Sequence, residues 1–62
     1  MSERLKDLVD REVEKFYYRH AEGVRVGVLD IPKIFEEGRE AFAAGRDLEA
    51  AVQASIARYR LN

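Results

Sequence analysis

The chain contains no cysteine and no tryptophan, and only one histidine and one proline among its 62 residues. Without cysteine it can form neither a disulfide nor a thiolate metal site, and one histidine is too few for a typical zinc centre. A chain of this length buries only roughly 60% of its unfolded surface, so small domains often depend on disulfides, a metal or oligomerisation. We therefore expect its stability to come from helix packing or from association with other chains.

Strong charge of one sign and long apolar runs are also missing. The 11 basic and 12 acidic residues leave a formal net charge of -1, which gives no global attraction to nucleic acid or to anionic lipid. No apolar run approaches the ~20 residues that span a bilayer, and charges in MSERLKDLVDREVEK occupy the positions where a secretory signal is apolar. We expect one folded domain over residues 1–62, located in the cytoplasm and without a membrane partner.

The first segment has the spacing of an amphipathic helix from Ser2 to about Ala21. Ser2 can cap its start, and Gly23 can supply the left-handed conformation that ends helices. The apolar positions follow one another at steps of three and four, which places them on one helix face. They are Leu5, Leu8, Val9, Val13, Phe16 and Tyr17.

A second helix is predicted over about residues 31–44, beginning at Pro32 and ending at Gly45. Gly38 lies on its apolar stripe, although glycine inside a helix costs roughly 1 kcal/mol relative to alanine. This position predicts a close crossing with another helix. The alternative is a break or kink of the helix at Gly38.

A third helix is predicted over about residues 48–61, with Asp47 as its cap. Leu48, Val52, Ile56 and their neighbours form one apolar face, and a run of small residues forms a second face beside it. Such a wide apolar surface predicts packing on two sides. The second face contains Ala50, Ala54, Ala57 and Leu61.

The stretch between the first two helices alternates as a strand does. In Val24–Leu29 three valines alternate with Arg25, Gly27 and Leu29, which predicts a strand; the alternative is an extended linker. We expect this strand to pair antiparallel with its copy in a second chain, because no other strand is predicted. The fold class is therefore mainly α, helix-strand-helix-helix, as a homodimer. The predicted interface residues are Val24, Val26, Val28, Gly38, Val52 and Ile56.

Residues 24–61 resemble the ribbon-helix-helix family of dimeric DNA-binding proteins. The resemblance is carried by VRVGVL, the helix opening at Pro32, the turn AAGRD and a last helix ending in IARYR. It implies base reading by outward residues of the paired strands and phosphate binding at the N-terminus of the last helix. The readers would be Arg25, Gly27 and Leu29, and only Arg25 can make a bidentate contact with guanine. We rank nucleic acid below a protein partner.

No residue pattern indicates catalysis. His20 is predicted to interact with the C-terminal end of the first helix, and Ser55 to be a small packing residue, because neither has a catalytic context. Tyr18 falls off the apolar stripe and is expected at the surface or at a subunit contact. We predict a non-enzymatic homo-oligomeric interaction or regulatory module with no metal, cofactor or catalytic site. The alternatives are a ribbon-helix-helix transcriptional regulator and an accessory subunit of a larger enzyme.

Overall fold

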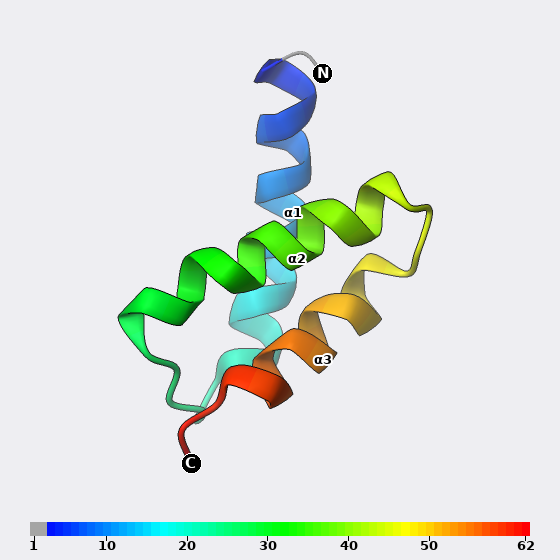
Figure 1. Ribbon diagram of the computed structural model, residues 1–62. Coiled ribbons are helices and arrows are strands. Elements are labelled where there is room, and N and C mark those ends of the chain that lie inside the picture. The colour runs from blue at the N-terminus through cyan, green and yellow to red at the C-terminus, as the bar shows by residue number, and fades with distance from the viewer. Residues whose placement is uncertain (1–2) are drawn as a thin grey trace.

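A computed structural model describes residues 3–62, so the predicted cap Ser2 lies outside the described residues. The elements are α1 (Glu3–Ala21), the short 3-10 helix η1 (Val28–Asp30), α2 (Ile31–Ala43) and α3 (Leu48–Tyr59) (Figure 1). The prediction of a mainly helical chain with three α-helices is confirmed. The predicted strand is not present, and its place is taken by an extended segment and η1.

The three helices form two layers. α2 and α3 lie side by side in opposite directions, and α1 crosses behind both of them (Figure 1). The first turns of α1 extend past α2 and leave the helix pair. This overhang explains why Leu5 and Leu8 are exposed although both belong to the predicted apolar face.

The core lies where the three helices cross. Its fully or almost fully buried residues come from all three helices, as the apolar spacing of each helix predicts. They are Val9, Val13, Ile34, Val52 and Ile56. Phe16, Tyr17, Phe35 and Tyr59 are partly buried against this cluster, together with Val24 and Val26 of the connecting segment.

Glycine ends two of the helices. Gly23 and Gly45 have φ angles of 77° and 72°, a left-handed conformation in which a side chain would be strained. At Gly45, the N–H groups of Gly45 and Arg46 donate to the carbonyls of Phe42 and Ala41, the pair of bonds that defines a Schellman motif. The predicted stop at Gly45 is therefore confirmed.

The cap of α3 follows the sequence as well. The Asp47 side chain accepts a hydrogen bond from the N–H of Ala50 at 3.3 Å. This satisfies one of the unpaired donors at the helix start.

Gly38 lies at the crossing of α1 and α2. α2 is continuous through it, so the alternative of a break at this residue is wrong. A Cβ atom at Gly38 would stand 2.7 Å from Cγ2 of Val13. The absence of a side chain therefore lets the two helices approach closely, as its place on the apolar stripe predicts.

The predicted strand Val24–Leu29 is corrected. Within residues 3–62 there is no strand; Val26 forms an isolated antiparallel bridge with Arg60, and Val28 and Leu29 already belong to η1. The sequence predicts no pairing partner inside the chain because it predicts no other strand, and it places residues 60 and 61 in the third helix. α3 instead ends at Tyr59, and Arg60 is extended, with φ -64° and ψ 144°. The end of the chain thus pairs with one backbone edge of Val24–Leu29, which we call the valine segment.

Candidate functional site

The valine segment and the residues that follow α3 are joined by two hydrogen bonds beside the bridge. The N–H of Leu61 donates to the carbonyl of Arg25 at 2.8 Å. The N–H of Arg25 donates to Oδ1 of Asn62 at 2.9 Å. The two segments, distant in the sequence, therefore form one surface at the end of the molecule opposite the overhang of α1 (Figure 1).

Large apolar side chains are exposed on this surface. Val28 is 80% exposed, Leu29 is 85% exposed and Leu61 is 65% exposed. Val24 and Val26, in contrast, are partly buried against the core. We call the set Arg25, Val28, Leu29, Arg60 and Leu61 the bridge surface.

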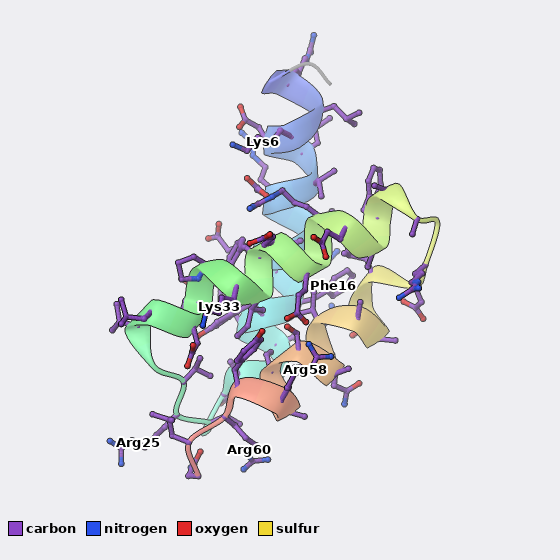
Figure 2. All side chains as sticks on the ribbon, in the orientation of Figure 1. Lys6, Phe16, Arg25, Lys33, Arg58 and Arg60 are labelled. Atoms are coloured by element: carbon purple, nitrogen blue, oxygen red, sulfur yellow. The ribbon has the colours of Figure 1, made fainter. Side chains whose placement is uncertain are left out.

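The charge of the bridge surface is positive. Arg25 and Arg60 both point outward from this end of the molecule (Figure 2). Neither forms an ion pair within the described residues, and Arg60 donates to the backbone carbonyl of Asn62. The nearby carboxylate of Asp30 is paired with Lys33 at 3.5 Å. The surface therefore combines exposed apolar side chains with two arginines that have no carboxylate side chain as a partner among the described residues.

Val26 leaves one edge of its backbone open. The bonds across the bridge use the backbone of Arg25 and Leu61, so Val26 and Arg60 form a pair that is not itself hydrogen-bonded. In this pattern the N–H and C=O of Val26 point away from Arg60. Neither group has a hydrogen-bond partner in the described part of the chain. Such an edge can accept another extended segment.

The remaining predicted interface residues lie inside the chain. Val52 is fully buried and Ile56 is 3% exposed, both packed in the core of the three helices. Gly38 is buried against Val13. A second chain could reach these three residues only if α3 or α1 moved away. The valine segment is thus the part of the predicted interface that lies near the surface.

The sequence patterns did not predict a polar cluster that is centred on Glu37. Glu37 of α2 accepts hydrogen bonds from three residues of α3: Ser55 Oγ at 2.9 Å, Tyr59 Oη at 2.6 Å and Nη1 of Arg58. Ser55 is fully buried and has its partner here. In the sequence, Ser55, Arg58 and Tyr59 are spaced by three and four residues, which places them on one face of a helix. This spacing does not indicate that their common partner is Glu37 of α2.

The protonation of this cluster follows from its contacts. Burial alone would raise the pKa of Glu37, but the hydrogen bonds from Tyr59, Ser55 and Arg58 outweigh it and hold the pKa below the ordinary value of 4.5. The same carboxylate raises the pKa of Tyr59. The Glu37 cluster therefore joins α2 to α3 with Glu37 ionised at neutral pH.

His20 also has a partner that the sequence did not indicate. Its Nε2 lies 2.9 Å from Oε2 of Glu49, and Nη1 of Arg19 donates to the same oxygen at 2.9 Å. The hydrogen bonds from His20 and Arg19 lower the pKa of Glu49. The end of α1 is thus fastened to the first turn of α3, where a carboxylate is also favoured by the helix dipole.

The two polar groups with reactive side chains, Ser55 and His20, have different partners. The Ser55 hydroxyl is buried and donates its hydrogen bond to Glu37. His20 lies in another part of the molecule, where its partner is Glu49. No group of three or more potential metal-ligating side chains was found among the described residues. None of the helices in residues 3–62 is long and apolar enough to cross a membrane.

A shallow groove runs between α2 and α3 on the face turned away from α1. It has a volume of about 790 Å³, and its floor is made by small side chains such as Ala51 and Ala54. Its lining also includes Glu37, Arg58, Arg46 and Asp47. The second alanine face predicted for the third helix is therefore open in the single chain.

Comparison with known proteins adds no family to this description. No protein-family model, no curated protein and no solved structure matches the chain.

Proposed function

We propose that the chain is a non-enzymatic interaction module that associates with a second copy of itself through the bridge surface. The observation that carries this proposal is the coincidence, at one end of the molecule, of an open backbone edge at Val26 with exposed apolar side chains at Val28, Leu29 and Leu61. Exposed apolar patches of this kind mark interaction sites.

A second copy satisfies the open edge in a defined register. Two Val26 residues placed opposite each other across a two-fold axis would exchange their N–H and C=O groups as a hydrogen-bonded pair. In this register Arg25 faces the second copy's Gly27, which has no side chain. The guanidinium groups of the two copies are therefore not directly opposite each other. The exposed Val28 comes to lie beside the second copy's Val24.

The self-association can be tested by substitutions at exposed positions. Val28 and Leu29 are almost fully exposed, so Val28→Lys and Leu29→Lys should leave the folded chain intact. We expect each to weaken dimerisation about five-fold or more, because a lysine would be buried at the interface. Leu8→Lys, the same change on the overhang of α1, is the control. Light scattering on a size-exclusion column gives the mass of each variant.

An isotope-filtered NOE experiment locates the interface. A sample mixed from labelled and unlabelled chains should show contacts between the methyl groups of Val28 and those of the second copy's Val24. A dimer whose intermolecular contacts lie on another surface would contradict the proposal.

A DNA-binding regulator is the second candidate, and a specific observation favours it. Arg25 and Arg60 point outward from the same surface without a carboxylate partner among the described side chains (Figure 2). Asp47 and Glu49, however, place carboxylates at the start of α3, where the family resemblance puts a phosphate. We therefore rank this function second. A band shift with genomic DNA fragments at low salt that is lost in Arg25→Ala would reverse the order.

A further inference from the structure

A second hollow lies between α1 and α2, and its walls are aromatic. It has a volume of about 400 Å³ and is lined by Glu14, Tyr17 and Tyr18 of α1 and by Ile31 and Phe35 of α2. We call it the aromatic pocket. It shares no residue with the bridge surface, so ligand binding there does not depend on self-association.

The three rings of the aromatic pocket are inclined to one another. The centroids of Tyr17 and Tyr18 are 5.7 Å apart with an angle of 63° between the ring planes. The centroids of Tyr17 and Phe35 are 6.0 Å apart with an angle of 34°. Tyr18 is 70% exposed, so its ring is accessible to a ligand.

Among the described residues, cationic side chains lie over other aromatic rings but not over those of the aromatic pocket. Lys15 and Arg19 lie 5.2 and 5.4 Å from the ring centroid of Phe16. Lys33 and Arg58 lie 6.0 and 5.8 Å from that of Tyr59. Within the described residues, no cation lies over a ring of the aromatic pocket.

The carboxylate of the pocket is unpaired as well. Glu14 is exposed and forms no ion pair in the described part of the chain. The pocket thus places a negative charge beside three aromatic rings, over which no cation lies among the described residues. An anion would be repelled by Glu14, and a neutral apolar molecule would gain nothing from it. An organic cation gains from both features.

We propose that the aromatic pocket binds an alkylammonium group, with the methylated form preferred. A methylated ammonium ion is weakly hydrated and spreads its charge over methyl groups, which pack against ring faces. Tyr17, Tyr18 and Phe35 contact the methyl groups, and Glu14 balances the charge. The group can belong to a free small molecule or to a methylated lysine side chain of a protein.

The probe that tests this assignment is choline, compared with its neutral isostere 3,3-dimethylbutan-1-ol. Both are titrated into the labelled chain while amide and aromatic chemical shifts are followed by NMR. We expect choline to shift the signals of Tyr17, Tyr18 and Phe35 and to bind about five-fold or more tightly than the isostere, since one cation–π contact contributes about 1 kcal/mol. Equal shifts from both compounds, or no shift with choline at 100 mM, would overturn the proposal.

Two substitutions test separately how the rings and the charge contribute to choline binding. Tyr18→Ala removes the exposed ring, and Glu14→Gln removes the charge at nearly constant shape; each should weaken choline binding about three-fold or more. Glu36→Gln, at an exposed position of α2 outside the pocket, is the matched control and should bind like the wild type. Choline binding that is unchanged in both pocket variants would place the cation elsewhere and contradict the assignment.

A second ligand distinguishes between a free cation and a methylated lysine side chain of a protein. A short glycine- and alanine-based peptide containing trimethyl-lysine is titrated in the same way. Tighter binding of the peptide than of choline indicates a protein side chain, and equal binding indicates a free cation.

Discussion

Gly38 and Val13 are in contact at the crossing of α2 and α1, with space for no further atom between them. A Cβ at position 38 would be 2.7 Å from one methyl carbon of Val13 and 3.2 Å from the other. Val13 is fully buried and β-branched, so its side chain has little freedom to turn away. The distance between these two helices is therefore set by a residue that has no side chain.

This contact predicts the effect of Gly38→Ala. Alanine gains up to about 1 kcal/mol in helix propensity, but overpacking against Val13 costs about 1 to 3 kcal/mol. We expect a net loss in the free energy of unfolding, measured by urea denaturation, and a larger loss for Gly38→Leu. In a Val13→Ala background the same Gly38→Ala change should be neutral or stabilising. A stabilising effect in the wild-type background would show that the crossing is loose.

The Glu37 cluster predicts a pH dependence of stability. The pKa of Glu37 is lower in the folded chain than its ordinary value of 4.5, so the unfolded chain binds the proton more tightly. Its contribution is present above about pH 4.5 and is lost as the pH falls through the lowered pKa. Glu37→Gln should therefore reduce the free energy of unfolding at pH 7 by about 1 to 3 kcal/mol and by less at acidic pH.

The neighbouring residue provides the control for this measurement. Glu36 is exposed on the same helix, so Glu36→Gln should leave both the stability at pH 7 and its pH dependence nearly unchanged. The pKa of Glu49 is lowered as well, so part of the acid dependence should remain in Glu37→Gln. Identical pH profiles for Glu37→Gln and the wild type would show that the cluster does not form in solution.

The hydrogen bond from Leu61 to Arg25 can be removed without disturbing the backbone. Arg60 already has the extended conformation that a following proline requires, so Leu61→Pro removes the N–H donor at little steric cost. We expect faster hydrogen exchange at the Arg25 amide and a loss of about 0.5 to 1.5 kcal/mol in stability. Leu61→Ala, which keeps the donor, is the control. Equal exchange rates in the two variants would show that the bridge contributes nothing.

The helices were predictable because the residues that define each helix lie close together in the sequence. Apolar spacing, Asp47 and Gly45 define α2 and α3 without reference to the rest of the chain. The valine segment was not predictable in the same way: its alternation fits a strand, but its partner, Arg60, lies at the end of a segment with a helical pattern. The pairings of Glu37 with Ser55 and of His20 with Glu49 likewise depend on how the helices cross, which single-sequence spacing does not specify.

The proposed association with a second copy through the bridge surface can be measured by sedimentation equilibrium. The wild type and Leu29→Lys are compared at several loading concentrations in the micromolar range. We expect twice the monomer mass for the wild type and a mass nearer to that of the monomer for Leu29→Lys at each concentration. A wild-type mass that stays at the monomer value as the concentration rises would contradict the account.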